Sequence, residues 1–495
     1  MKISKILITI VLIFGIFLRV YFFVGPCCDD DVAYLNSAHN LLKLNFVELK
    51  SGNNFGYRTM MNVPIALFFI LLGISEFTAS LYILLTSVGS ILVVYLLGKL
   101  LFNELTGIIA AFLLAIYPLE VIYSTHIVPD VPLAFWISLS VLFLLWGEKK
   151  KNHLYYILSG VFAGLGYLVK ITGIVIFPFV FFYILFFLKK EKIKLLFKFL
   201  LGFVIIFLIE CSYSYYFTSH PFTSYKSHIS AQEAWGHMKE KSREEIINNL
   251  LFYPTVMFSL GSNLNNLNLY SGVFFWLFVL VCLTPISYKK KRREFLIVLL
   301  WFFSVFLFLQ FGTMDITRFI LTHKLIRFLT VLSIPLCLAI AHFFSSILSK
   351  KYFPSFFVIL IFLIFLTYDS ITRINTVTSY ENNQILGDVR EIYKVLKSLP
   401  EKDVYFYQYT REFGLLEFYF GFDEKDRLKL IYNMPCESIK NAYVVTDDNV
   451  WYYSGGPEYP DCLKNPPEEW ELIAIIKKAD KGPYSLFDPK VFLVR

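Results

Sequence analysis

The sequence predicts a polytopic α-helical membrane protein of about eleven transmembrane helices with a C-terminal extracytoplasmic α/β domain. Of the 495 residues, 57% are hydrophobic and only 17% are charged, and the mean hydropathy is +0.59. Such a balance is far from that of an ordinary soluble domain. Lys and Arg cluster in short loops between apolar runs, so the net charge of +8 reports membrane topology. No nucleic acid partner is expected.

The apolar runs are long enough to count as membrane spans. A helix needs about 20 mainly apolar residues to cross the hydrocarbon core. The stretch "MNVPIALFFILLG" at 61–73 is shorter, and we expect a re-entrant or interfacial segment there. The eleven candidate spans are residues 4–24, 78–98, 107–124, 131–147, 154–170, 172–188, 195–217, 267–287, 295–311, 325–347 and 353–371.

The basic loops indicate the orientation in the cell membrane. With the N-terminus in the cytoplasm and 61–73 not crossing, every strongly basic loop falls on the cytoplasmic side, as the positive-inside tendency requires. These loops are residues 147–151, 189–194, 288–294 and 349–352. The same parity places two loops of the membrane domain (1–372) outside, at 25–77 and 218–266, together with a soluble domain at 373–495.

The C-terminal region changes character and reads as a small α/β domain. Short aromatic strands such as "DVYFYQY" (403–409) alternate with helical patterns such as "DVREIYKVLKSL" (388–399). Cys436 and Cys462 lie here, and the sequence leaves open whether they pair. Three cysteines in apolar runs, Cys211, Cys282 and Cys337, are expected to be packing residues.

Candidate chemistry begins where the first span ends. Cys27 and Cys28 follow this span, and Pro26 argues against lipoprotein processing, so we expect an uncleaved anchor. The acids at 29–31 come next, and their simplest interpretation is a solvated loop or the N-cap of the following helix. The segment after that helix carries the cation Arg58 where a lipid head group would lie. A carboxylate can act as base for a hydroxyl, and Arg pairs with phosphate.

Five motifs in residues 1–350 together resemble the dolichyl-phosphate-mannose protein mannosyltransferase superfamily, that is, glycosyltransferase family 39 and its bacterial aminoarabinose-transferase relatives. The order "DDxxY" (Asp30, Asp31, Tyr34) is similar to the "DExxY" that starts the first external loop of this family. The other four are "FGYRTMMNVPIALFFILLGISEFTASL" (55–81), "YSTHIVPDVPLAFWISLSVL" (123–142), "GVFAGLGYLVKITGIVIFP" (160–178) and "HKLIRFLTVLSIPL" (323–336).

The resemblance implies a membrane glycosyltransferase of the GT-C type. Its donor would be a sugar linked to polyprenyl or dolichyl phosphate, reached from within the bilayer. Transfer would proceed with inversion to a protein, lipid or glycan acceptor on the outer face. By the same resemblance Asp30 matches the catalytic base, Asp31 stands in the glutamate place, and Asp130 matches a second acid bordering the cavity. Arg58 lies near the family's Lys-Pro or His-Pro position, and this chain has neither dipeptide there, which leaves donor recognition open.

The residues also support this chemistry without the resemblance. Transfer from a phosphate leaving group needs cations to take up the charge that grows on the phosphate, and Arg58, Lys170 and Arg327 are candidates. Alternatives remain: Lys170 could snorkel at a helix end, and Arg327 could pair with an interface carboxylate or a lipid phosphate. We assign Asp30 as catalytic and expect Asp31, Tyr34, Arg58, Asp130, Lys170 and Arg327 to contact substrate.

Metal binding and other functions were also weighed. The external segment 218–266 contains His220, His228 and His237 with Glu233, but their spacing fits no zinc signature, and solvated histidines are expected. The chemistry requires no cofactor and leaves a divalent metal open. A transporter or flippase is the main alternative, although transporters place ionisable sites near the midplane and show repeats. A non-catalytic subunit that binds lipid-linked glycan would not need Asp30.

Overall fold

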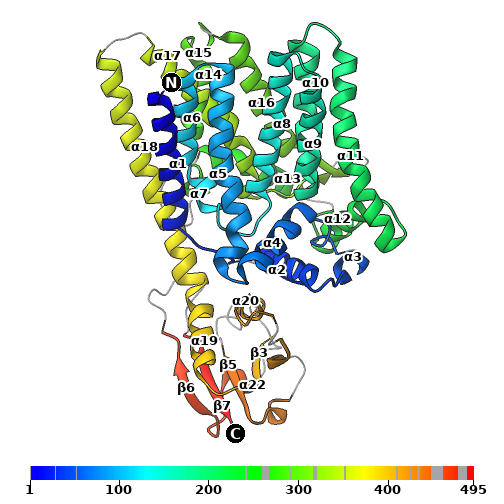
Figure 1. Ribbon diagram of the computed structural model, residues 1–495. Helices are drawn as coiled ribbons and strands as arrows, with labels where there is room; N and C mark the ends of the chain where they lie inside the picture. Colours follow the sequence, from blue (N-terminus) through cyan, green and yellow to red (C-terminus); the bar gives the residue numbers. More distant parts are fainter. Residues whose placement is uncertain are drawn as a thin grey trace.

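The computed structural model contains a helical bundle and a smaller α/β domain that lies beyond one end of it (Figure 1). It describes residues 2–27, 29–51, 53–239, 242–258, 267–289, 291–315, 320–349, 353–407, 411–422, 425–431, 435–446, 461–477 and 488–495.

Seven helices within the described residues are long and apolar enough to cross a membrane. They are α1 (Lys2–Tyr21), α5 (Glu76–Leu101), α8 (Asp130–Lys150), α11 (Lys192–Thr218), α16 (Arg292–Phe311), α17 (Ser333–Leu348) continued from the 3₁₀ helix η3 (Ile326–Leu332), and α18 (Phe353–Tyr380). The shorter apolar helices are α4 (Thr59–Leu72), α6 (Glu104–Ile116), α9 (Leu154–Val169), η1 with α10 (Ile171–Val175, Ile176–Phe187) and α14 (Phe274–Leu283). Each of the eleven expected spans therefore falls on an apolar helix, while length alone supports seven crossings.

Local sequence explains where several of these helices begin. Ser75 caps α5, because its hydroxyl accepts a hydrogen bond from the amide of Thr78 and the Thr78 hydroxyl accepts one from the amide of Ser75. Asn103 caps α6 in the same manner through the amide of Thr106. Pro118 occupies the first turn of the short helix α7 (Pro118–Ile122), where its missing N–H is not needed.

The basic loops gather at the end of the bundle that also holds the N-terminus (Figure 1). Arg293 forms an ion pair with Glu148 and donates to the carbonyl of Phe187 at 3.1 Å, while His153 lies 3.6 Å from Glu191. These contacts bring the loops after α8, α10 and α15 (Ile286–Lys289) together. The C-terminal domain lies at the opposite end, as the charge pattern predicted; the side of the membrane that each end faces stays a prediction.

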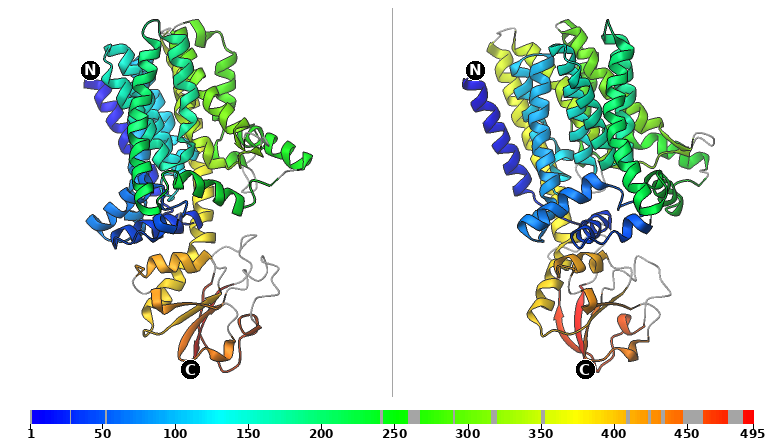
Figure 2. Two further views of the ribbon diagram at one scale, coloured as in Figure 1. Left: turned by 90° about the vertical axis from the view of Figure 1, so that its right-hand side faces the viewer. Right: turned by 45° about the vertical axis from the view of Figure 1, so that its right-hand side comes forward.

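Short helices of the two predicted external loops collect at the end nearer the C-terminal domain (Figures 1 and 2). The first loop forms α2 (Asp29–Leu42) and α3 (Val47–Ser51) and continues into α4. The second forms α12 (Thr223–Ala234) and α13 (Arg243–Phe258), followed by η2 (Leu267–Tyr270). A small hairpin, β1 (Thr313–Asp315) with β2 (Ile320–Leu321), precedes η3.

The C-terminal domain is built on a mixed sheet with the order β4-β3-β5-β7-β6 within the described residues. Strand β3 pairs in parallel with β4 and β5, whereas β7 is antiparallel to β5 and β6. The strands are β3 (Val404–Tyr407), β4 (Leu428–Ile431), β5 (Ala442–Thr446), β6 (Glu471–Ile475) and β7 (Lys490–Val494). The helical segments are the π-helical turn η4 (Glu381–Ile385), α19 (Gly387–Ser398), α20 (Arg411–Tyr419), η5 (Lys425–Arg427), η6 (Cys436–Ser438) and α22 (Asp461–Lys464).

Cys436 and Cys462 form a disulfide across this domain. Their Cα atoms lie 6.2 Å apart, within the range that a disulfide can bridge. The bond packs beside a small apolar cluster that includes Ile439, Leu463 and Trp470. The pairing that the sequence left open is therefore present.

Candidate active site

Two carboxylates and two cations form a continuous chain at the end of the bundle nearer the C-terminal domain. Asp30, in the first turn of α2, forms an ion pair with Arg327 at the start of η3. Arg327 Nε also lies 3.3 Å from Asp130 Oδ2, and Asp130 Oδ1 accepts from Lys170 Nζ at 2.9 Å. The four side chains come from four segments that are far apart in the sequence. The structure thus brings together residues that the sequence could only name separately.

The two acids differ in exposure. The Asp30 side chain is 31% exposed, whereas that of Asp130 is 1% exposed. The buried Asp130 carboxylate lies at the N-terminus of α8, where the helix dipole favours a negative charge, and it is stabilised by Arg327 and Lys170. Of these two carboxylates, that of Asp30 is the one open to solvent.

The contact between Arg327 and Asp130 is an ion pair by distance but lacks hydrogen-bond geometry. Arg327 Nε and Asp130 Oδ2 are both buried without a hydrogen-bond partner among the described residues. A buried donor and a buried acceptor at one place retain the capacity to bind a polar ligand.

Lys170 is placed by the end of α9. It follows the last helical residue, Val169, and its ammonium group lies 3.6 Å from the ring centroid of Phe328. An aromatic face on one side and the Asp130 carboxylate on another stabilise the buried cation. This arrangement differs from snorkelling towards a membrane surface, the alternative that the sequence left open.

Arg58 approaches the same cluster from the start of α4. Its guanidinium donates to the hydroxyl of the buried Tyr34 and lies 5.4 Å and 5.3 Å from the ring centroids of Tyr34 and Phe55. Burial lowers the pKa of Arg58 to about 10, while Asp30 and Asp130 oppose this fall. The group is still cationic at neutral pH, so a third positive charge faces the two acids.

A small pocket beside Arg58 contains polar groups that the sequence analysis missed or misjudged. Burial, with the charges of Arg58 and Lys170, lowers the pKa of His228 to about 4. The expectation of a solvated histidine is therefore wrong for His228, which is neutral at physiological pH. Glu210, within the apolar helix α11, could have been noticed as an acid inside a span. The lining residues are Asn54, Tyr57, Arg58, Tyr167, Leu168, Ile171, Glu210, Ser224 and His228.

The other two histidines of this segment lie elsewhere. His220 contacts Lys226 at 2.8 Å, and His237 stacks on His323 with ring centroids 4.1 Å apart. Within the described part of the chain, the three histidines and Glu233 are not brought together as a metal site.

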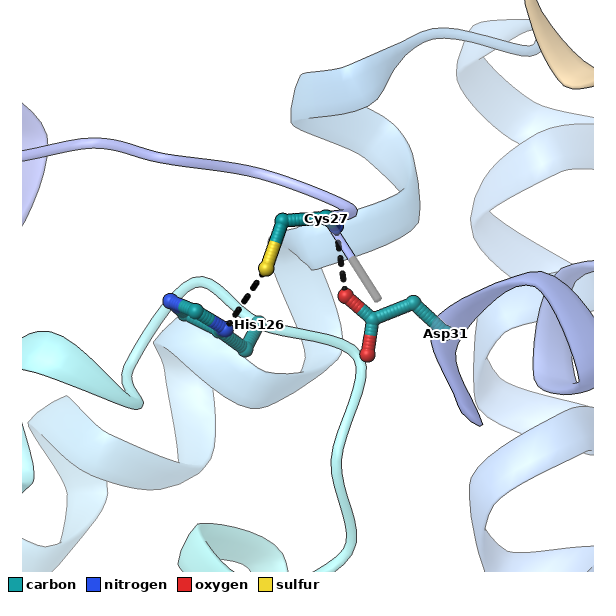
Figure 3. Close-up of side chains that lie close together, drawn as sticks. All are labelled: Cys27, Asp31 and His126. Atoms are coloured by element: carbon teal, nitrogen blue, oxygen red, sulfur yellow. Dashed lines mark hydrogen bonds between the residues drawn. The ribbon is translucent and has the colours of Figure 1, made fainter. Parts of the chain in front are cut away.

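Asp31 faces away from the acid and cation chain. It is fully buried, and its Oδ2 accepts from the backbone N–H of Cys27 at 2.7 Å (Figure 3). Its neighbours are Cys27 and His126. The substrate-binding role assigned to Asp31 stays a prediction, and the structure gives this residue a different set of contacts.

Comparisons with known proteins match part of the chain by sequence and nearly all of it by fold. Residues 59–216 match the family described as dolichyl-phosphate-mannose-protein mannosyltransferase. The matched segment runs from the first residue of α4 into the last turn of α11 and contains Asp130 and Lys170, but Asp30 and Arg327 lie outside it. No curated protein matches the chain by sequence.

Solved structures share the fold over nearly the whole chain. ArnT from Cupriavidus metallidurans bound to undecaprenyl phosphate superimposes with a TM-score of 0.62 and 14% identity over 99% of this chain and 97% of ArnT. The oligosaccharyltransferase of Archaeoglobus fulgidus in complex with Zn and sulfate superimposes with a TM-score of 0.57 and 15% identity, over 97% of this chain and 72% of that protein. The oligosaccharyltransferase AglB of the same organism, in complex with an inhibitory peptide and a dolichol-phosphate, superimposes with a TM-score of 0.54 and 15% identity, over 98% of this chain and 74% of AglB. At such identities the likeness establishes the fold.

Proposed function

We propose that this chain, a GT-C protein of the dolichyl-phosphate-mannosyltransferase-like superfamily, transfers a sugar from a polyprenyl-phosphate donor to an acceptor hydroxyl on the extracytoplasmic face. The observation that carries the proposal is the row of ion pairs that links Asp30, Arg327, Asp130 and Lys170, with Arg58 beside it. It combines one accessible carboxylate with three cations at one end of a membrane bundle. Two structural neighbours contain undecaprenyl phosphate or dolichol-phosphate, which supports a lipid-phosphate donor.

In the proposed reaction the acceptor oxygen attacks the anomeric carbon of the donor sugar. The bond from that carbon to the phosphate oxygen breaks, and the acceptor proton passes to the Asp30 carboxylate. The leaving polyprenyl phosphate gains one negative charge. Arg327, Lys170 and Arg58 would stabilise this charge, because cations held in place act most strongly where charge develops. Attack opposite the leaving phosphate inverts the anomeric centre.

The ion pair between Asp30 and Arg327 gives the donor a role in activating the base. A phosphate that binds Arg327 competes with Asp30 for the guanidinium, so the carboxylate is released to accept a proton. Asp130 keeps Arg327 and Lys170 in place through its two contacts. We assign Asp130 as a positioning residue for both cations.

The test compares transfer by the wild-type chain and by Asp30→Asn in proteoliposomes. Radiolabelled polyprenyl-phosphate sugars serve as donors, with a crude envelope fraction as acceptor. We expect transfer to fall by about 100-fold or more when the base is lost. Asp369→Asn is the matched control, since Asp369 also pairs with an arginine, Arg373, at 2.9 Å but lies on α18, which contributes none of the proposed site residues; this variant should transfer normally.

Three outcomes separate the alternatives. Loss of transfer in Asp30→Asn alone supports both the enzyme class and the base. Equal transfer by Asp30→Asn and the wild type would remove Asp30 from the mechanism. If the wild type transfers no sugar from any donor but moves the labelled lipid across the bilayer, the chain is a flippase instead.

A further inference from the structure

A second cluster of chemically active side chains lies at the connection between α1 and α2. It contains Cys27 from the loop after α1, Asp31 from the first turn of α2, and His126 from the turn between α7 and α8 (Figure 3). All three are buried, and their ligand atoms lie within 4.8 Å of one another. Sulfur, imidazole nitrogen and carboxylate oxygen are the three ligand types that zinc takes in proteins.

The separation of sulfur and nitrogen matches a shared metal ion. Cys27 Sγ lies 3.4 Å from His126 Nδ1. On a tetrahedral zinc ion, with bonds of about 2.3 Å to sulfur and about 2.0 Å to nitrogen, the two ligand atoms are about 3.6 Å apart. The Asp31 carboxylate is fixed beside them by its hydrogen bond from the Cys27 amide, at 2.7 Å. A cation could therefore replace the proton between thiol and imidazole with little movement of the chain.

Glu381 orients the imidazole for this role. His126 Nε2 lies 3.2 Å from Glu381 Oε2, and the side chains are only 3% and 10% exposed. When Nε2–H donates to this carboxylate, the lone pair of Nδ1 points to Cys27. A carboxylate that holds the far nitrogen of a histidine in this way is the usual outer partner of a metal-binding histidine.

We propose that Cys27, Asp31 and His126 bind a zinc-like divalent cation that fastens the loop after α1 and the start of α2 to the turn before α8. Glu381 is a positioning residue, and it lies in η4, where α18 passes into the C-terminal domain. The site is separate from the chain of Asp30, Arg327, Asp130 and Lys170. Metal binding is measured directly, so the proposal can fail or succeed whatever the outcome of the transfer assay.

The consequence for the protein is a fixed first turn of α2. Asp31 is adjacent to Asp30, so a cation on Asp31 restrains the backbone that carries the proposed base. The same cation ties this turn, through His126 and Glu381, to the junction with the C-terminal domain. The cation would then add a buried link between the two parts of the molecule.

The test measures metal binding by the purified full-length chain in detergent. After metal removal, the protein is titrated with Zn²⁺ in competition with a chromophoric chelator. We expect one tight zinc ion per chain, which Cys27→Ala and His126→Ala abolish. Glu381→Gln should weaken binding by about 10- to 100-fold, as for other outer partners of metal ligands. Cys337→Ala, which changes a buried cysteine of α17, is the matched control and should bind zinc like the wild type.

A spectroscopic measurement guards against variants that misfold. Cobalt replaces zinc in the otherwise unchanged Cys28→Ala protein, where a thiolate-to-cobalt charge-transfer band that is lost on the further change Cys27→Ala reports Cys27. The band is expected at one cobalt per chain. Its absence, or zinc binding that is equal in the wild type and in a folded Cys27→Ala variant, would overturn the proposal and leave a thiol to imidazole hydrogen bond.

Discussion

The aspartates at the start of α2 show how neighbouring residues acquire different tasks. Successive side chains on a helix point about 100° apart. Asp30 therefore turns towards Arg327, whereas Asp31 turns towards Cys27 and His126. One side chain is accessible and the other is fully buried. The helix geometry thus directs one acid to the proposed reaction site and the next to the buried cluster with Cys27 and His126.

Arg19 is a buried charge within the membrane bundle. It lies in the last turn of α1, donates to the Ser87 hydroxyl at 2.8 Å, and donates to the carbonyl of Ala115 at 3.2 Å. The Ser87 hydroxyl in turn lies 3.2 Å from Glu120, which also accepts from Ser333 at 2.8 Å. This network links α1, α5, α7 and α17. Its interpretation is structural, because both charges are enclosed by protein.

Replacing Arg19 tests that interpretation. Arg19→Met removes the hydrogen bonds to Ser87 and Ala115 and the positive charge that lies near the buried Glu120, and each buried polar group left without its partner costs about 1–3 kcal/mol. We expect a large fall in the thermal unfolding midpoint in detergent. The double variant Arg19→Met with Glu120→Gln should recover part of the loss, since no uncompensated charge remains. An unchanged midpoint in Arg19→Met would show that the network contributes no stability.

The stability of the protein should depend on pH through His228. Its pKa falls from 6.5 to about 4 because burial, helped by Arg58 and Lys170, disfavours the charged form. Above pH 6.5 the imidazole is neutral in the folded and unfolded states and has no effect. Between pH 6.5 and about 4 only the unfolded state takes up the proton, so the free energy of unfolding decreases as pH falls.

The difference between wild type and His228→Gln isolates this contribution. Unfolding midpoints of both proteins are measured from pH 7.5 to 4.5. We expect the wild type to lose more stability than the variant towards low pH. His220→Gln, in the same external segment, should behave like the wild type. Parallel curves for wild type and His228→Gln would contradict the lowered pKa of the half-buried His228.

Among the elements, α9 and α11 cross closely because glycines face each other. A Cβ atom added at Gly160 would lie 1.9 Å from the carbonyl oxygen of Phe199, and one added at Gly202 would lie 2.0 Å from that of Ile157. Small residues allow such backbone contact, which is how helices gain packing energy in a membrane. The pair fixes α11 against α9 and thereby fixes one wall of the pocket beside Arg58.

A methyl group at this crossing should separate the helices. We expect Gly160→Ala to lower stability by at least about 2 kcal/mol, since neither backbone can yield without a shift of a whole helix. Gly166→Ala, on the same helix, is the control, because the nearest atom to its added Cβ would be 3.6 Å away. Thermal unfolding of both variants in nanodiscs gives the comparison. Equal midpoints would mean that the crossing is looser than the structure shows.

Helix α4 has the features expected of an interfacial segment. Its 14 residues span about 21 Å at 1.5 Å per residue, less than the hydrocarbon thickness of about 30 Å. Met61, Ile65 and Phe69 face the protein, whereas Val63 and Ile70 are exposed. Such a helix suits a position along the membrane surface, where it holds Arg58 at the level of lipid phosphates. The position in a bilayer stays a prediction.

For the whole molecule, Arg390 connects the C-terminal domain to the bundle. From α19 it donates to Glu76 at 2.9 Å, to the carbonyl of Val24 at 2.8 Å and to the side chain of Asn382 at 2.9 Å. Tyr419 of α20 also donates to Glu76, and burial raises the pKa of this tyrosine. Two elements of the domain thus converge on one carboxylate at the start of α5.

Removing this arginine should loosen the domain without unfolding it. In Arg390→Met we expect faster hydrogen exchange at the residue 22–27 and 387–398 segments and faster proteolysis at the domain junction. The core of the bundle and the smaller cluster of the domain, which includes Ile439, Leu463 and Trp470, should exchange as in the wild type, because neither includes residues of these two segments except Phe22. Arg427→Met, at an arginine within the domain, is the control. Protection at the junction that is unchanged in Arg390→Met would assign the docking to apolar contacts alone.

The sequence by itself determined the class of the protein and the loops and helix ends that carry the candidate site residues. Hydropathy and helix length depend only on local composition, so the apolar helices were found from residue runs. The basic loops, the short segment at 61–73 and the α/β character of the C-terminal domain followed in the same way. The resemblance named Asp30 and Asp130, and the need for cations beside a phosphate leaving group named Lys170 and Arg327, each as a separate residue.

The tertiary structure decided which of these residues meet. Asp30 and Arg327 are 297 positions apart, and His126 and Glu381 are 255 apart, so no local pattern links them. The different partners of Asp30 and Asp31, the lowered pKa of His228 and the cluster at Cys27 all depend on the packing of helices from distant segments. Whether a side chain is buried, and which side chains it contacts, depend on that packing. Local sequence patterns therefore do not predict them.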